Sequence, residues 1–336
     1  MPLLGGDRGA GLIPRSGGVR GRGLEAIAAS GVMPGAGTGT KAGVPAAREP
    51  ETRPGRAMEL FPRCANPDCA SGWIRLWRSR SAPVFERGWC CSPACTRARI
   101  EAALWRELGP KAAGGESYRH RIPIGLAMLE QGWITAAQLR RAVGMQREAG
   151  GGRLGNWLVR SGAVSESLVA RAVGLQWSCP VLSLDRHDAE AGAVLLPRLF
   201  VDALRALPVR VAGGRLLYLG FEDRLDPQVA VAIERMNGLR VESGVVESGR
   251  FDQAHREALL APYPPCELIE AATESGLGRA LANAIESRQP VESRLVRVHD
   301  FLWLRMWTRR QSGAVPRPNE VRDLLCAVSP RSGGTD

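Results

Sequence analysis

Five of the eight cysteines in this 336-residue chain lie between residues 64 and 95, in an order that suits a metal site. Cys64 and Cys69 form one close pair, and Cys91 and Cys95 form another after a spacer rich in tryptophan and arginine. Two such pairs, each on a turn, are typical of a tetrahedral zinc site with four thiolate ligands. Because four protein ligands leave no open position for a substrate, the predicted zinc is structural.

The choice of ligands is not unique, because Cys90 directly precedes Cys91. We favour Cys91, since the order Cys-Ser-x-x-Cys followed by a helix over residues 96–108 is common at the second turn of such sites. A redox-active pair of Cys90 and Cys91 is the alternative. A disulfide is disfavoured, because the N-terminal residues lack the apolar core of a secretory signal.

A second feature is a segment that occurs twice in tandem, as residues 123–146 and residues 153–176. In each copy apolar residues recur at helical spacing, and a glycine, Gly132 or Gly162, ends the first helix. A threonine or serine then begins a longer helix. Each copy is therefore predicted to be a short helix, a glycine turn and a longer helix. Two packed copies of one unit offer two equivalent half-sites to a pseudo-symmetric ligand.

The second copy opens with Arg153-Leu154-Gly155, continues through apolar positions and a glycine, and closes with Gln176. This pattern resembles the tandem cyclic di-GMP-binding motif in the N-terminal domain of type II secretion and type IV pilus assembly ATPases. The resemblance covers about residues 120–260 and implies a helical subdomain followed by a small α/β subdomain. Landmarks in the same order as in that family are Pro180, Leu196-Pro197, Ala206-Leu207-Pro208-Val209, Gly213-Gly214 and Asp226-Pro227.

The resemblance implies that cyclic di-GMP is the ligand. An arginine suits it, because a guanidinium stacks on guanine or forks onto its O6 and N7 atoms. The second motif is complete, whereas Pro123 replaces the arginine of the first and Arg121 is the nearest substitute. We therefore expect weak, asymmetric binding; a repeat kept purely for packing is the alternative. The implied ligand-binding residues are Arg121, Ile124, Gly125, Gly132, Leu139, Gln146, Arg153, Leu154, Gly155, Gly162 and Gln176.

The P-loop ATPase that follows this domain in the family has no counterpart in the sequence. There is no GxxxxGK[ST] motif, and the residues after 260 are too few for a nucleotide-hydrolysing core. His299-Asp300 interrupts an apolar run, where a turn or a satisfied core pair is favoured over a catalytic pair. We therefore expect a non-enzymatic regulatory or adaptor protein that binds cyclic di-GMP or docks onto type II secretion or type IV pilus machinery.

The formal charge of +11 and the isoelectric point near 10.0 would ordinarily indicate nucleic acid as a partner. Nearly all the basic residues are arginines, which is typical of a GC-rich coding bias. Arg75, Arg78 and Arg80 in the cysteine-flanked spacer nevertheless leave a second hypothesis open: a zinc-containing nucleic-acid-binding protein that uses the repeats for assembly. No apolar stretch reaches the ~18 residues of a membrane span, so we expect a soluble, cytoplasmic protein without membrane insertion.

The predicted fold class is α+β, with a zinc-ribbon-like module, a helical repeat subdomain and a small α/β subdomain. The predicted divisions are a disordered tail (1–57), a zinc-finger-like module (58–108), the repeats (119–180), the α/β subdomain (181–262), a helix plus strands (263–310) and a disordered end (311–336). Met58 is a candidate start of translation.

Periodicity and turn signals predict the elements within these divisions. Expected helices cover 193–204, 227–236, a stretch from 251 and 266–288. Expected strands cover 207–212, 215–220 and 239–247, and a β-like tail spans 292–308. A Trp-x-Arg-x-Trp sequence at 303–307 places three large side chains on one face of a strand. The same sequence occurs at 73–77, and the two either pack together or recur by coincidence.

Overall fold

The computed structural model describes residues 64–70, 84–109, 121–271, 273–310, 313 and 315–327. All of them belong to one unit of the chain, Met58–Asp336. The predicted α+β class is confirmed, with helices and two mixed sheets. None of the helices in this described part has the length and apolarity that a membrane crossing requires.

The tandem repeat forms two helix pairs, as predicted. The helices are α2 (Ile124–Glu130) and α3 (Ala136–Glu148) in the first copy, and α4 (Leu154–Arg160) and α5 (Glu166–Trp177) in the second. Gly132 and Gly162 have φ values of 69° and 71°, the left-handed conformation that ends a helix readily only at glycine. Thr135 and Gln138 form the capping box that begins α3.

The small α/β subdomain contains a three-stranded sheet in the order β3-β4-β5. β3 (Leu207–Ala212) runs antiparallel to β4 (Leu216–Phe221), which runs parallel to β5 (Arg240–Val245). The helices are α6 (Ala189–Leu195), α7 (Arg198–Ala203), α8 (Pro227–Asn237) and α9 (Ser248–Leu259). The single helix predicted over 193–204 is wrong, because Pro197 cannot continue a helix and separates α6 from α7.

A six-stranded sheet has the order β2-β1-β7-β8-β9-β6, and most of its strands come from the C-terminal part of the chain. Its long strands are β7 (Glu292–Val298), β8 (Phe301–Trp307) and β9 (Val321–Ala327), and its short ones are β1 (Val84–Phe85), β2 (Gly88–Trp89) and β6 (Cys266–Ile269). A 3-10 turn, Pro318–Glu320, precedes β9. The turn predicted at His299-Asp300 joins β7 to β8.

Two predictions for the C-terminal region are wrong. Residues 311–336 are not disordered throughout, since β9 lies inside the sheet between β8 and β6. The predicted helix over 266–288 is a strand, β6, followed by the shorter helix α10 (Glu274–Arg288). The Thr273 side chain caps the N-terminus of α10, which fixes where that helix begins.

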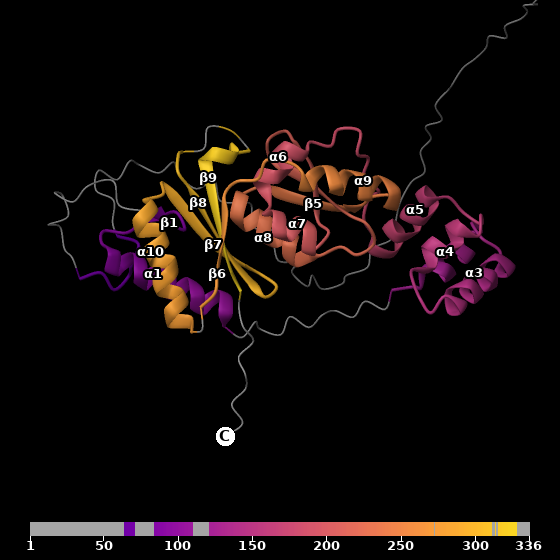
Figure 1. The fold of residues 1–336 in the computed structure, drawn as a ribbon, viewed down its shortest axis with the longest axis horizontal. Helices are drawn as coiled ribbons and strands as arrows, with labels where there is room; N and C mark the ends of the chain where they lie inside the picture. The colour runs from indigo at the N-terminus through magenta and orange to yellow at the C-terminus, as the bar shows by residue number, and fades with distance from the viewer. Residues whose placement is uncertain are drawn as a thin grey trace, which may run out of the picture. The chain divides into compact units, whose positions relative to one another are not determined.

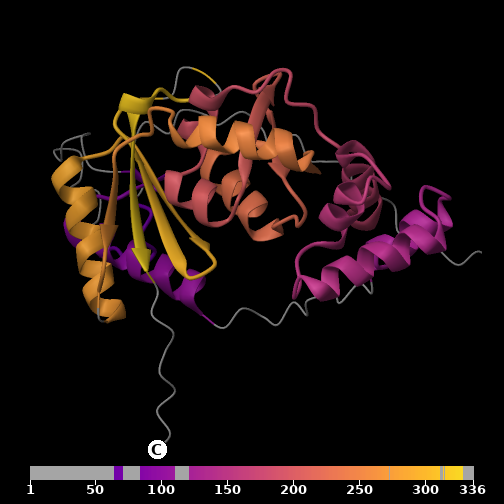
Figure 2. The same ribbon diagram turned by 45° about the vertical axis from the view of Figure 1, so that its right-hand side comes forward.

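The cysteine-bearing segment shares a sheet and a core with the C-terminal residues. Phe85 of β1 pairs in parallel with Ser293 of β7, and α1 (Pro93–Leu108) lies beside α10 on one face of the sheet (Figures 1 and 2). Ile100 and Leu104 of α1 are buried in this core. The sequence predicts separate divisions at 58–108 and 263–310, because pairing between strands so far apart has no local signal.

A buried ion pair connects β8, β9 and α8. The Arg305 side chain is fully buried and donates through Nε and Nη2 to the two carboxylate oxygens of Asp323, at 2.7 Å each. Its Nη1 donates to Asn237 Oδ1, and Trp303 Nε1 donates to Asp323 Oδ1, both at 2.8 Å. Trp303, Arg305 and Trp307 are all buried on β8, but their counterparts at 73–77 lie outside the described residues.

We expect Asp323→Asn to destabilise the full chain by roughly 3–5 kcal/mol, because the substitution leaves the Arg305 charge buried without its counter-charge. Chemical denaturation measures this loss. Arg322→Gln, at the adjacent exposed position of β9, is the matched control and should change stability by no more than about 0.5 kcal/mol. Equal effects of the two substitutions would contradict a structural role for the pair.

Candidate functional site

The two copies of the repeat hold each other through equivalent hydrogen bonds. Gln146 Nε2 donates to the Gly152 carbonyl oxygen at 2.5 Å, two positions before α4 begins. Gln176 Nε2 donates to the Ile122 carbonyl oxygen at 2.9 Å, two positions before α2 begins. Each long helix thus fixes the approach to the short helix of the other copy, as pseudo-symmetry requires.

The glycines near the start of each short helix allow close helix packing. A Cβ atom added at Gly155 would lie 2.6 Å from Val169 Cγ1 of α5, and one at Gly125 would lie 2.7 Å from Leu139 Cδ1 of α3. Both distances are shorter than carbon atoms tolerate. These two glycines, and the turn glycines described above, therefore have a sufficient structural explanation without any ligand.

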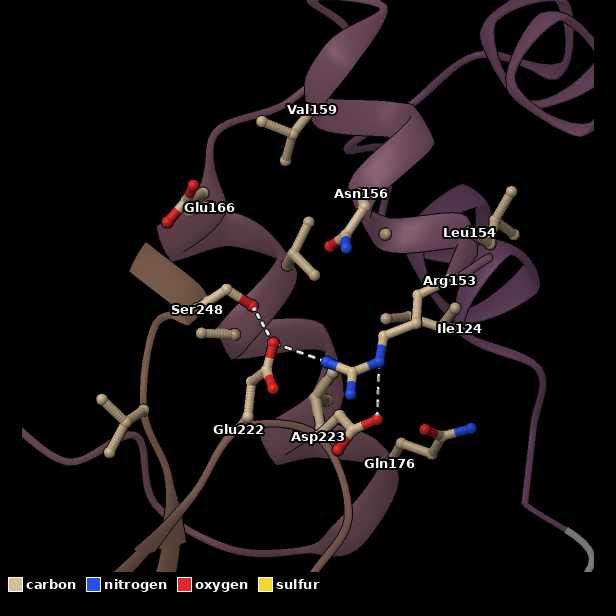
Figure 3. Close-up of a pocket in the computed structure, with 15 residues that line it drawn as sticks. Ile124, Arg153, Leu154, Asn156, Val159, Glu166, Gln176, Glu222, Asp223 and Ser248 are labelled. Carbon is tan, nitrogen blue, oxygen red and sulfur yellow. Dashed lines mark hydrogen bonds and ion pairs between the residues drawn. The ribbon is translucent and has the colours of Figure 1, made fainter. Parts of the chain in front are cut away.

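A pocket of about 190 Å³ lies between the second copy and the α/β subdomain. Its walls come from the start of α4, one face of α5, the loop after β4 and the start of α9 (Figure 3). Five of the sequence-predicted residues meet there: Ile124, Arg153, Leu154, Gly155 and Gln176. The other residues in its lining are Asn156, Val159, Glu166, Val169, Ala170, Val173, Glu222, Asp223, Val246 and Ser248.

Arg153 carries the positive charge of this pocket and is paired inside it. Its Nη1 lies 2.5 Å from Glu222 Oε1, and its Nε lies 3.1 Å from Asp223 Oδ2 (Figure 3). The Arg153 side chain is 46% exposed, and that of Glu222 is 9% exposed. The hydrogen bond that Arg153 donates to Glu222 raises the pKa of Arg153, and the charges of Asp223 and Glu222 add to that effect.

Glu222 stays ionised although it is nearly buried. Burial alone would raise the pKa of its carboxyl group, but hydrogen bonds from Arg153 and Ser248 and the charges of Arg153 and Arg205 outweigh burial and lower it. Arg205 Nη2 lies 3.0 Å from Glu222 Oε2, and Ser248 Oγ donates to Glu222 Oε1 at 2.9 Å. The carboxylate therefore accepts hydrogen bonds from the repeat and from the α/β subdomain at the same time.

Two further hydrogen bonds join the second copy to the α/β subdomain around the pocket. Trp177 Nε1 donates to the Asp223 carbonyl oxygen, and Gly249 N–H at the start of α9 donates to Glu166 Oε2, both at 2.9 Å. A carboxylate at a helix N-terminus is a favourable placement. The side chains of Ala170 and Val173 are buried in the same contact.

The first copy has no comparable arginine at its opening. Pro123 takes the position equivalent to Arg153 and makes no side-chain cap on α2. Arg121 stacks on the Trp177 ring, with its Cζ atom 3.1 Å from the ring centre, and lines a neighbouring cavity with Gln176. Gly125, Gly132, Leu139, Gln146 and Gly162 are not among the residues that line the Arg153 pocket.

Two acidic residues of the site, Glu222 and Asp223, lie outside the tandem repeat. Glu222 and Asp223 follow β4, and Ser248 begins α9, so they reach the pocket only through the tertiary fold. No spacing rule within the repeats predicts them.

The metal candidate is a group of four cysteines. The sulfur atoms of Cys64, Cys69, Cys91 and Cys95 all lie within 4.8 Å of one another. Cys91 and Cys95 flank the start of α1, where Ser92 Oγ accepts from the Cys95 N–H at 3.3 Å. Such a group of thiols suits a soft, tetrahedral cation such as zinc.

The neighbourhood of the four cysteines favours a bound cation. Burial raises the pKa of the Cys91 thiol to about 11, with further increases from the neighbouring thiols, so without a cation this side chain is a neutral thiol. Asn66 Nδ2 donates to Cys95 Sγ at 3.5 Å, as a supporting group of a thiolate ligand would. Cys90 is buried outside the group of four.

Part of this chain is similar in sequence to a known protein. No protein-family model matches it. Over 181 residues, 52% of its length, it is 30% identical to the type IV pilus assembly ATPase PilB of Thermus thermophilus. The aligned region of this chain is therefore homologous to part of a type IV pilus assembly ATPase. The aligned region spans only 20% of that relative.

Two solved structures are similar to part of the chain. MshE with cyclic di-GMP is 26% identical, with a TM-score of 0.34, and the match covers 41% of this chain and 99% of that one. The N-terminal domain of XpsE is 23% identical, with a TM-score of 0.30, and the match covers 40% of this chain and 92% of that one.

Three glycine-to-alanine substitutions test the packing of the repeat. We expect Gly155→Ala to destabilise by roughly 1–3 kcal/mol, because the new methyl group meets the stiff Val169 side chain. Gly144→Ala, inside α3 with no atom near the added carbon, should stabilise by roughly 0.5–1 kcal/mol. Gly125→Ala should lie between them, because the end of Leu139 moves more easily. Thermal unfolding ranks the three, and any other order would contradict the packing described.

Proposed function

We propose that this chain is a non-enzymatic regulatory or adaptor protein of the cytoplasm whose repeat subdomain binds cyclic di-GMP at the Arg153 pocket. The proposal is supported most by one observation: Arg153, Leu154 and Gly155 line a single pocket together with Ile124 of the first copy and Gln176. These are the residues to which the resemblance assigns ligand contacts. Homology to a pilus assembly ATPase gives the proposal its biological setting.

The chemistry of the pocket suits a flat base linked to a phosphate. The guanidinium of Arg153 can fork onto a phosphate or onto guanine O6 and N7, and it is accessible enough to do so. Val169 and Val173 on α5 provide an apolar wall against which a base can lie. Gly155 adds no side chain that would narrow the entrance.

The two half-sites differ in strength. The first copy offers Pro123 where the second offers Arg153, and Arg121 is engaged with the Trp177 ring. The first half-site therefore contributes chiefly apolar contact from Ile124. In this proposal the repeat subdomain also docks onto a component of the type II secretion or type IV pilus machinery, and the ligand changes its state. A nucleic-acid function would rest on Arg75, Arg78 and Arg80, which lie outside the described residues.

We propose that the four cysteines hold one structural zinc ion. Its binding would connect the loop that carries Cys64 and Cys69 to the start of α1, and α1 packs on α10 in the core of the six-stranded sheet. Metal binding is linked to folding where the site is not formed in the unfolded chain. The zinc would therefore support the C-terminal sheet as well as its own loop.

Elemental analysis of the purified chain should find about one zinc per molecule, the stoichiometry of a single tetrahedral site. Cys91→Ser should lower the zinc content, whereas Cys90→Ser, the matched control outside the group, should leave it unchanged. Chelation should lower the melting temperature of the C-terminal sheet and leave the repeat helices folded. Full zinc occupancy in Cys91→Ser, or no zinc in the natural chain, would contradict the proposed site.

Calorimetric titration with cyclic di-GMP tests the ligand. We expect Arg153→Ala to abolish binding, and Pro123→Arg to tighten it by about ten- to a hundred-fold, the effect of one added charge-assisted contact. Arg160→Ala is the control, because Arg160 belongs to α4 but does not line the pocket. Absence of binding by both the natural chain and Pro123→Arg would reject the ligand and leave the docking scaffold as the better account.

A further inference from the structure

The positive charge that would attract an anionic ligand is already neutralised by the protein itself. Arg153 uses Nη1 for Glu222 and Nε for Asp223, so two of its three guanidinium nitrogens are already engaged. Glu166 adds a third carboxylate to the lining of the same pocket. A phosphate entering here meets three negative charges and must compete for Arg153 (Figure 3).

We propose that Glu222 and Asp223 form an autoinhibitory latch on Arg153, so that cyclic di-GMP reaches the repeat side of the pocket only when Arg153 and the second copy are released from the α/β subdomain. The inference rests on the proposed function, since it names how the same pocket is regulated. Ligand binding and the docked arrangement are then mutually exclusive, and each weakens the other by the same factor.

The groups around Glu222 allow the latch to open without leaving the buried carboxylate unpaired. When Arg153 leaves, the Glu222 carboxylate keeps its contacts with Arg205 and with Ser248 Oγ. Arg205 adopts a left-handed backbone conformation with φ of 47°, which is unfavourable for a residue other than glycine. Its Nη2 also lies 2.6 Å from Asp252 Oδ1, so a second carboxylate helps to keep the guanidinium beside Glu222. Glu222 is thus held by residues of the α/β subdomain whether or not Arg153 is bound to it.

Asp223 is the weaker half of the latch. Its side chain is 47% exposed, so water replaces Arg153 when the contact breaks. Its backbone carbonyl accepts the Trp177 indole N–H, and Trp177 is the last residue of α5. Release of Arg153 therefore loosens a hydrogen bond that joins α5 to the loop after β4, and the state of the pocket is transmitted to the subdomain contact.

The first arm of the test is calorimetric titration of the full chain with cyclic di-GMP. We expect Asp223→Asn and Glu222→Gln to bind about tenfold more tightly than the natural chain, the effect of releasing one charge-assisted contact. Asp185→Asn is the matched control: it removes the same charge from an exposed pair with Arg250, and its affinity should equal that of the natural chain. Weaker binding by Asp223→Asn would overturn the latch, because the carboxylate would then be an acceptor for guanine N–H groups.

The second arm needs no ligand. We expect Arg153→Ala to accelerate hydrogen exchange of the Trp177 indole N–H and the Gly249 N–H several-fold, because both report the contact of the second copy with the α/β subdomain. Arg160→Ala should leave both rates unchanged. Unchanged rates in Arg153→Ala would overturn the latch whatever the titration gives. If no protein binds cyclic di-GMP, the proposed function fails, and the exchange rates alone decide whether the contact is a latch.

Discussion

The arrangement of the pocket depends on the carboxylate of Glu222 at the end of β4. It is nearly buried, and a buried carboxylate is tolerated only when donors satisfy its oxygens. The donors come from three segments: Arg153 at the start of α4, Arg205 after α7, and Ser248 at the start of α9. One acidic residue thus sets the position of the ligand-seeking arginine and the contact between the two halves of the homologous region.

The same principle recurs at two other places where distant segments meet in this arginine-rich chain. Glu107 of α1 is buried, accepts from Arg235 of α8, and also accepts from the Arg297 backbone N–H of β7 at 3.1 Å. Burial would raise the pKa of Glu107, but the arginines outweigh it and lower the value. Asp323 does the equivalent for Arg305 inside the six-stranded sheet. Carboxylates enclosed by guanidinium groups therefore join parts of the fold that local sequence treats as separate.

The sequence predicts well those features that depend on interactions between residues close together in the chain. The repeat helices follow from apolar spacing, from the capping box of Thr135 and Gln138, and from turn glycines at Gly132 and Gly162. The four-cysteine group follows from ligand spacing, and its sulfur atoms lie together. Gly125 and Gly155 of the short helices give less support for a ligand than the resemblance implies, because packing against Leu139 and Val169 already requires glycine there.

Long-range contacts explain what the sequence does not predict. β9 carries Asp323 at a buried position. In the sequence, a charged residue in a short apolar stretch near the glycine-containing C-terminus indicates a loop. Only its pairing with Arg305 explains why it lies inside a strand. The pairing of Phe85 with Ser293 joins the cysteine segment to the C-terminal sheet and leaves no local trace. Glu222 and Asp223 likewise follow a strand with no motif around them.

Nuclear magnetic resonance of the isotope-labelled chain, titrated with cyclic di-GMP, tests the central claim most directly, because the Arg153 Nε–H group reports its own partner. We expect this signal to shift as the ligand replaces Asp223, and the Trp177 indole signal to shift with it. The signal of the Trp303 indole, which is buried in the six-stranded sheet, should not move. Binding that leaves the Arg153 signal unchanged, or no change in any signal at saturating ligand, would contradict the account.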